Sequence, residues 1–326
     1  RGTGGSEGNW EPNINERNDG KNTLDWLNSL NEVESIGYIG NSYLALTGWA
    51  AADIVPDKVK TMYLTHYGTD RFTSAYKNGM FRQDVLTSWA MENAGFPVQA
   101  DYIESAKYRP HIKVDEEMWG VGLDWYRSWI TSTNRDDSYW REGFWKVLAD
   151  IPKKVTIPVY LGGGWYDHHL GSAFKTWQNL SQKAKEHSVF RIGAWNHGFM
   201  PCVQGVEAKN LENADEINAF NWLYNLLVLK NLPDGEVKIY KIGADFWQSK
   251  REYPFQNDQL EYFFSTDKCD DDNAYMLQRK APDKKGQIHY IYDPDQPVLS
   301  HGAESMMRTM NEVGSLPQPE CGWRDD

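Results

Sequence analysis

The segment from Gly40 to Ala45 places a serine where a predicted strand gives way to a helix of small, apolar residues. A serine at such a sharp turn exposes its hydroxyl, and the backbone N–H of Tyr43 and the helix N-terminus can then stabilise an oxyanion. Gly40 avoids a side chain that would collide with the turn. The second glycine of the G-x-S-x-G motif is absent, because Leu44 stands there, so the segment alone is equally typical of an ordinary serine in a loop.

An aspartate and a histidine complete a candidate catalytic triad with Ser42. Asp167 and His197 each follow a predicted strand, and open α/β sheets carry their functional residues just beyond the carboxyl ends of the strands. The order Ser, Asp, His is the one that α/β-hydrolases use, with the histidine as general base and the aspartate orienting it. Three aromatic residues flank the acid and the base and are expected to line a substrate pocket: Trp165, Tyr166 and Trp195.

Two further histidines, His168 and His169, directly follow Asp167 and raise the question of a metal site. Adjacent side chains are expected to point in different directions, and no carboxylate or cysteine lies at ligand spacing. We therefore expect no metal ion, and nothing in the sequence calls for a cofactor. His66 ends an earlier predicted strand, and we expect it to be a hydrogen-bonded structural residue.

Strands and helices alternate on both sides of a long insertion. This alternation predicts an α/β fold, with a parallel sheet covered on both faces. The predicted strands are 35–39, 59–66, 155–162 and 188–194, and the predicted helices are 22–30, 43–53, 170–184 and 213–230. Residues 67–151 contain helical stretches such as 83–93 and 119–132 and no convincing strand, which indicates an inserted helical cap. Beyond residue 233, short alternating segments separated by polar turns predict a β-sandwich or jelly roll, with strands at 236–243, 260–265 and 287–292.

Composition excludes several classes of function. The chain carries 46 acidic and 34 basic residues, a net charge of −12, whereas a nucleic-acid clamp needs a basic face. The sequence contains no run of 18 apolar residues, so it predicts no membrane-spanning helix. The three cysteines form neither a disulfide framework nor a zinc pattern, which favours the cytoplasm, although the sequence leaves localisation open. Aromatic residues make up 14% of the chain, in keeping with an aromatic core or aromatic-lined pockets.

Four segments together resemble the α/β-hydrolase family of cocaine esterase, α-amino acid ester hydrolases and X-prolyl dipeptidyl peptidases. They are Arg1–Gly8, Gly40–Tyr43, Gly164–Asp167 and Trp195–His197. The resemblance implies that Ser42 is the nucleophile, Asp167 the orienting acid and His197 the general base, and that the backbone N–H of Tyr43 binds the oxyanion. It also implies a hydrolase core at 1–66 and 152–232, a helical cap at 67–151, and a C-terminal jelly roll that starts at 233.

Two departures from the family pattern bear on this interpretation. Ala45 replaces a family glycine, which a helix tolerates. Relatives also carry an oxyanion tyrosine upstream of the segment in which this chain begins, so we expect the chain to be an interior part of a longer three-domain enzyme, truncated at both ends.

The expected function is a serine hydrolase that cleaves small esters, amides or short peptides through an acyl-enzyme. The sequence leaves open whether it is an acyl esterase or an X-prolyl dipeptidyl peptidase, and whether it forms a homodimer. The alternative is a catalytically degenerate relative that binds a glycan or another small molecule.

Overall fold

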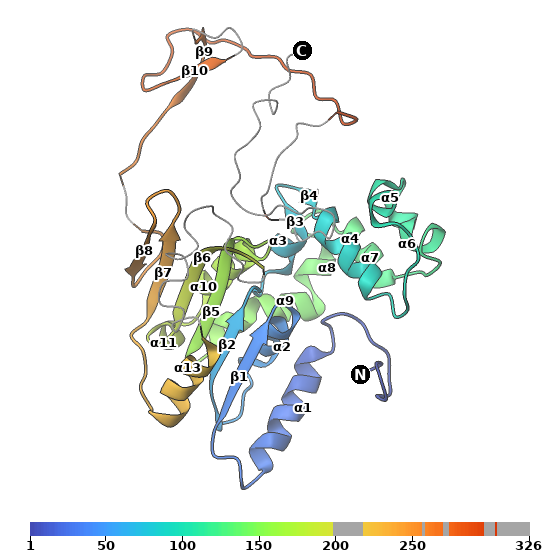
Figure 1. Cartoon of the computed structure of the whole chain (residues 1–326), viewed down its shortest axis with the longest axis vertical. Helices are drawn as coiled ribbons and strands as arrows, with labels where there is room; N and C mark the ends of the chain where they lie inside the picture. The colour runs from blue at the N-terminus through green and yellow to red at the C-terminus, as the bar shows by residue number, and fades with distance from the viewer. Residues whose placement is uncertain (198–217, 256–257, 270–273, 297–303, 305–326) are drawn as a thin grey trace. The chain divides into compact units, whose positions relative to one another are not determined.

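A six-stranded sheet forms the centre of the larger part of the molecule (Figure 1), with the strand order β1-β2-β5-β6-β7-β8. The computed structural model describes residues 1–197, 218–255, 258–269, 274–296 and 304. The first five strands of the sheet run parallel, and β8 runs antiparallel to β7. The strands are β1 (Ile36–Asn41), β2 (Val59–Thr65), β5 (Val159–Tyr166), β6 (Val189–Asn196), β7 (Glu236–Lys241) and β8 (Phe246–Lys250). The α/β fold with a mostly parallel sheet, as predicted, is confirmed.

Helices cover both faces of this sheet. On one face lie α2 (Tyr43–Ala51) and α10 (Leu170–Asn179), and on the other lies α13 (Ala219–Leu223), which continues into a π-helical turn. The indole of Trp222 on α13 donates a hydrogen bond to Thr61 Oγ1 on β2 at 2.8 Å. Apolar burial on both faces is what stabilises a parallel sheet.

Two boundaries near the site differ from the sequence prediction. β5 begins at Val159 rather than at residue 155, because Pro158 before it has no N–H to give to the sheet, and it continues through its three glycines. The first helix, α1 (Glu16–Ser29), packs on α2 and begins six residues earlier than predicted. The predicted helix at 213–230 lies partly outside the described residues, and its described part holds α13 and the π-helical turn.

The insertion at 67–151 is helical, as predicted, with one exception. Its α-helices are α3 (Arg71–Ala75), α4 (Gln83–Glu92), α5 (Tyr102–Lys107), α6 (Val114–Glu117), α7 (Asp124–Thr131), α8 (Ser138–Arg141) and α9 (Gly143–Asp150). The exception is a small hairpin of β3 (Tyr76–Lys77) and β4 (Met80–Phe81), where no strand was expected. Asn78 and Gly79 turn it with φ values of 52° and 84°, and Asn-Gly is the residue pair that such turns favour.

The expected domain boundary at residue 233 is wrong, because β7 and β8 belong to the core sheet. β7 pairs in parallel with β6, which no strand of a separate jelly roll would do. Alternating residues suit an outer strand of the core sheet as well as a sandwich strand, so periodicity could not separate the two. Residues 252–300 belong to a second unit, in which the described residues form the antiparallel pair β9 (Phe263–Lys268) and β10 (Tyr275–Gln278). Residues 287–292 form no strand, and the jelly roll stays a prediction.

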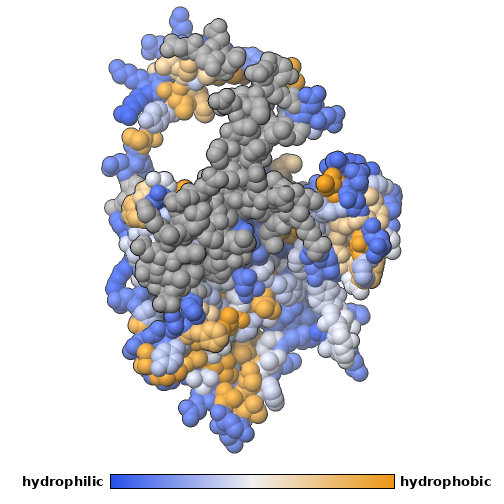
Figure 2. All heavy atoms as spheres, viewed as in Figure 1, coloured by the Kyte–Doolittle hydropathy of each residue, from blue (hydrophilic) through white to orange (hydrophobic). Residues whose placement is uncertain are grey.

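Apolar side chains gather at the surface on α13 and the π-helical turn after it (Figure 2). Phe220, Tyr224 and Val228 are exposed there. Among the described residues, no helix has both the length and the apolar character that a membrane span requires.

Candidate active site

Ser42 occupies a strained turn between β1 and α2. Its φ of 56° and ψ of −124° lie where residues with a side chain are rarely found, and such strain is typical of functional sites. The backbone N–H of Ser42 donates to Thr65 O at 2.9 Å, which anchors the turn to the end of β2. Helix α2 begins at the next residue, so the strain directs the hydroxyl away from the sheet at the helix N-terminus.

Gly40 makes this turn possible because α2 passes directly over it. A Cβ atom at this position would lie 2.4 Å from Leu44 O and 2.8 Å from Ala45 N. Both are backbone atoms, which cannot rotate away as the end of a flexible side chain can. Ala45 itself is fully buried, so the alanine that replaces the family glycine is accommodated.

Gly40→Ala should destabilise the protein by about 1–3 kcal/mol, because the added methyl group must push the start of α2 away from β1. Urea unfolding followed by circular dichroism measures this change. Gly20→Ala in α1 is the matched control, since its Cβ would meet only Ala51 Cβ at 3.6 Å. That substitution should instead stabilise the helix by about 0.5–1 kcal/mol. Equal effects of the two substitutions would contradict the steric explanation.

His197 lies between Ser42 and Asp167 and hydrogen-bonds to both. Its Nε2 is 2.7 Å from Ser42 Oγ, and its Nδ1 is 2.9 Å from Asp167 Oδ1. An ionised carboxylate only accepts hydrogen bonds, so Nδ1 carries the proton and Nε2 is left to accept from the serine hydroxyl. The structure thus brings together the three residues that the sequence singled out, although 155 positions separate Ser42 from His197.

Asp167 is held in its charged form although it is buried. Burial by itself raises the pKa of the Asp167 carboxyl, but the charge and the hydrogen bond of His197 more than offset it and bring the pKa below its ordinary value. The backbone N–H of His169 also donates to Asp167 Oδ1, at 3.0 Å. The carboxylate is therefore fixed in position and ionised at neutral pH.

His66 lies against the site as a buried, neutral residue. Its Nδ1 is 2.9 Å from Asn41 Oδ1, and Asn41 precedes Ser42 in the chain. Its ring centroid is 5.5 Å from that of His197. Burial lowers the pKa of His66 to about 4. The residue makes the hydrogen bond expected of a structural histidine.

Acid should destabilise the protein partly through His66. Between about pH 6.5 and pH 4 the unfolded chain binds a proton at this residue and the folded chain does not, so stability falls as the pH falls. His66→Asn keeps a residue that tolerates the φ of 57° and removes this proton. The difference in the free energy of unfolding between wild type and His66→Asn should then shrink as the pH falls, by up to about 1.4 kcal/mol per pH unit.

Urea unfolding across this pH range measures that change. His289→Asn, at an exposed position, is the control and should keep the wild-type slope. A slope that is the same in His66→Asn and wild type would show that His66 takes up no proton on unfolding.

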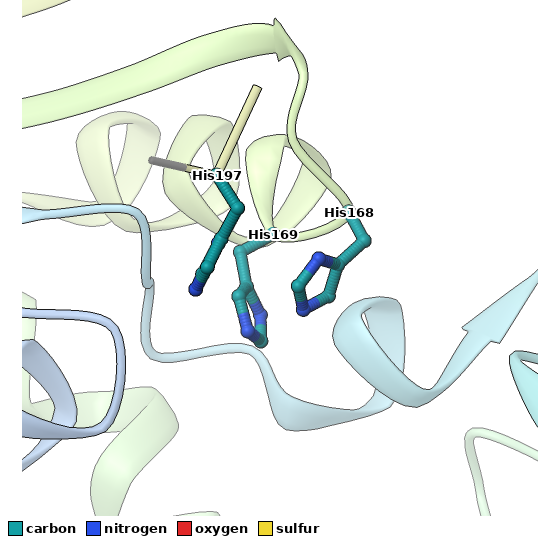
Figure 3. A group of neighbouring side chains, drawn as sticks. All are labelled: His168, His169 and His197. Atoms are coloured by element: carbon teal, nitrogen blue, oxygen red, sulfur yellow. The ribbon is translucent and has the colours of Figure 1, made fainter. Parts of the chain in front are cut away.

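His168 and His169 lie beside His197 rather than pointing apart (Figure 3). The ring centroids of the adjacent pair are 3.9 Å apart, so the expectation of divergent side chains is wrong. One ligand nitrogen from each of the three rings lies within 4.8 Å of the others, a grouping that could hold a metal ion. Both ring nitrogens of His197 already contact Ser42 or Asp167, so a metal ion would have to displace one of these contacts.

Burial keeps both adjacent histidines neutral. It lowers the pKa of His168 and of His169 well below the ordinary value, and the charge of Arg71 acts in the same direction on each. His169 Nδ1 is 2.7 Å from Ser74 Oγ on α3. The wall of the site next to the candidate triad therefore carries no formal charge from these two imidazoles.

A cavity opens beside Ser42, between the core and the inserted cap. On the core side Ser42, Tyr43 and His197 line it, and on the cap side α4 contributes apolar side chains. Tyr43 and Trp89 stack with an interplanar angle of 9°, which connects the nucleophile turn to the cap. The apolar lining from the cap comprises Val85, Leu86, Trp89 and Trp129.

The aromatic residues that the sequence proposed for this pocket do not line it. Trp195 is fully buried, its ring fills the space above Gly193, and it packs on Trp247. Trp165 donates from Nε1 to Tyr240 O at 2.8 Å. Neither of them nor Tyr166 lines the cavity beside Ser42. Proximity in sequence to the acid and the base was a poor guide, because Trp165 and Trp195 lie on strands and contact Tyr240 and Trp247 instead.

Comparison with known proteins gives the family. The model of the X-Pro dipeptidyl-peptidase (S15) family matches residues 1–199, more than half of the chain. The chain belongs to the S15 family. The predicted resemblance to this family is confirmed.

Individual relatives of this S15 protein are distant. Cocaine esterase from Rhodococcus sp. (strain MB1 Bresler) is 20% identical over 359 residues, which cover 100% of this chain and 61% of that protein. The chain thus spans less than two thirds of that relative's length.

Two solved structures share the fold. A crystal structure of an aminopeptidase from a marine sediment archaeon, Thaumarchaeota archaeon, is 19% identical, with a TM-score of 0.70, over 96% of this chain and 55% of its own. A selenomethionine-labelled α-amino acid ester hydrolase is 16% identical, with a TM-score of 0.58, over 78% of this chain and 47% of its own.

Proposed function

We propose that this chain carries the active site of a serine hydrolase that cleaves carboxylic esters or amides through an acyl-enzyme. One observation carries the proposal: Ser42 Oγ, on a strained strand-to-helix turn, lies 2.7 Å from His197 Nε2, and the opposite nitrogen of the same ring lies 2.9 Å from a buried carboxylate. Membership of a hydrolase family supports it. Geometry and assigned roles, rather than sequence position, identify such a triad.

In this mechanism the Ser42 oxygen attacks the substrate carbonyl while His197 Nε2 takes the hydroxyl proton. Asp167 stabilises the imidazolium that forms and holds its tautomer. His197 then gives the proton to the leaving alcohol or amine, and the acyl group stays on Ser42. Water attacks the acyl-enzyme with the same histidine as base, which releases the acid and restores the serine.

The oxyanion would lie at the N-terminus of α2. Tyr43 is the first residue of this nine-residue helix, so its backbone N–H has no acceptor within the helix. The hydroxyl of Tyr43 is already engaged elsewhere: it donates to Glu16 Oε1 at 2.7 Å and accepts from Asn13 N at 2.8 Å. We therefore assign the backbone of Tyr43, and not its hydroxyl, to the oxyanion.

Covalent labelling with a fluorophosphonate probe tests the proposal, because the probe reacts with activated serines. Ser42→Ala should abolish labelling. The matched control is Ser88→Ala. Ser88 lines the same cavity, but its hydroxyl donates to the backbone carbonyls of Asp84 and Val85. Labelling that is absent in wild type, or that persists in Ser42→Ala, would contradict the proposal and favour a binding protein. A p-nitrophenyl ester compared with Gly-Pro-p-nitroanilide then separates esterase from peptidase activity.

A further inference from the structure

Arg71 lies in the wall of the cavity that contains Ser42, and it is buried, with 6% of its surface exposed. Its Nη1 donates to the hydroxyl of Tyr67 at 2.8 Å. Its guanidinium carbon lies 4.4 Å from the ring centroid of Trp129 and 5.8 Å from that of Trp145. A guanidinium group stays charged in proteins, so a permanent positive charge lies at the cavity wall.

Among the described residues, no carboxylate forms an ion pair with Arg71, and its Nε has no hydrogen-bond partner. Two other described arginines that are partly or mostly shielded from solvent do have carboxylate partners. Arg17 pairs with Asp53 at 2.6 Å, and Arg82 pairs with Glu304 at 2.7 Å. Buried charges are normally paired, and stacking on tryptophan only partly replaces an anion.

Tyr67 supplies a second donor at the same place. It lines the cavity, and its oxygen accepts from Arg71, so its own proton remains for another acceptor. Burial raises the pKa of Tyr67 despite the charge of Arg71, which keeps the hydroxyl protonated. A guanidinium and a neutral hydroxyl side by side are the donors that a carboxylate accepts from.

The other residues that line the cavity indicate what the rest of a carboxylate ligand would look like. Val85, Leu86 and Trp89 provide an apolar wall that suits a short hydrocarbon or aromatic stem. The neighbouring His168 and His169 are neutral, and Glu92 reaches the same cavity from an exposed position on α4. The buried end of the cavity is therefore positive and its exposed edge negative.

We propose that Arg71 and Tyr67 form a carboxylate-binding subsite, so that the preferred substrates are esters or amides that carry a carboxylate on a short apolar stem. The inference rests on the proposed hydrolase function of Ser42. Charge-assisted hydrogen bonds to a buried anion favour it over a neutral isostere by about 10- to 100-fold. Arg71 is thus a specificity residue, and its substitution should change the ranking of substrates.

Matched pairs of substrates test this subsite. Glutaryl-p-nitroanilide and its terminal carboxamide place the anion on the acyl side, and 4-carboxyphenyl acetate and 4-carbamoylphenyl acetate place it on the leaving side. In wild type the ratio of kcat/KM for anionic over neutral substrate should be about 10 or more in one pair, which identifies the side. Arg71→Met should bring that ratio to about 1, and Arg71→Lys should give an intermediate value.

Arg141→Met is the control, because it removes a cap arginine that pairs with the exposed Asp136 and should keep the wild-type ratio. Fluorophosphonate labelling of Ser42 in each variant shows that the site is folded. A ratio near 1 in wild type for both pairs, or an unchanged ratio in Arg71→Met with labelling intact, would overturn the subsite and leave the hydrolase function standing.

Binding without turnover separates the two proposals further. Calorimetric titration of Ser42→Ala with glutarate should give at least about 10-fold tighter binding than titration with glutaramide, and Arg71→Met in that background should remove the difference. Equal binding of both ligands to Ser42→Ala would refute the subsite even if no turnover is found.

Discussion

Ser42→Ala should lower kcat for ester hydrolysis by about 10⁴- to 10⁶-fold. The substitution removes the oxygen that attacks the substrate, and His197 Nε2, 2.7 Å from that oxygen, loses the proton that it would transfer. What remains is binding and the oxyanion site, which together leave a small residual rate. Steady-state kinetics on a p-nitrophenyl ester, with the contaminating esterase background measured separately, checks this value.

The same experiment shows whether the residues act as a unit. His197→Ala combined with Ser42→Ala should cost no more than Ser42→Ala alone, because groups in one relay are not additive. Ser88→Ala, in the same cavity, should stay close to wild type. A loss below about 10-fold in Ser42→Ala, or additive losses in the double variant, would show that another group attacks the substrate.

Asp167→Asn should lower kcat by about 10⁴-fold. The free energy of unfolding should change little, because asparagine has nearly the same volume as aspartate. Asp167 Oδ1 accepts from His197 Nδ1 at 2.9 Å and from the backbone N–H of His169 at 3.0 Å. An amide at this position can offer its NH₂ group to Nδ1, which then keeps no proton, and Nε2 becomes protonated and can no longer accept from Ser42. The loss arises from the wrong tautomer of His197 rather than from a missing side chain.

Kinetics across a range of pH measures this effect, and Asp25→Asn is the control because it removes an exposed carboxylate paired with Lys21 on α1. The carboxylate of Asp167 stays ionised well below neutral pH, so the deficit of Asp167→Asn should persist throughout the neutral range. A variant that regains wild-type kcat near neutral pH would show that Asp167 does not determine the tautomer.

The sequence predicts the candidate site best where a local rule constrains the backbone. Gly40 is needed because helix α2 folds directly back over it, and that close approach is a property of the strand-to-helix turn itself. The order of Ser42, Asp167 and His197 behind three strands places them together in any parallel sheet with this connectivity. For these residues the fold adds distances to a set that the sequence already defined.

It failed where contacts are made between segments far apart in the chain. Arg71 carries no sequence signal for a pocket, and it lines one because the cap folds back over the end of the sheet. Trp165 and Trp195 were expected there because they flank the acid and the base, but their neighbours in space are Tyr240 and Trp247. Sequence proximity measures distance along the chain, and a strand sends successive side chains to opposite faces.

The sequence by itself therefore determined the fold class, the family and the candidate triad, because each follows from local turn chemistry and from the order of strands. Only the tertiary structure decided which strands complete the sheet, that His168 and His169 lie beside His197, and that an arginine without a carboxylate partner among the described residues faces the nucleophile's cavity. These features depend on packing between distant segments, where side chains of the same type can be buried, paired or exposed according to what lies against them.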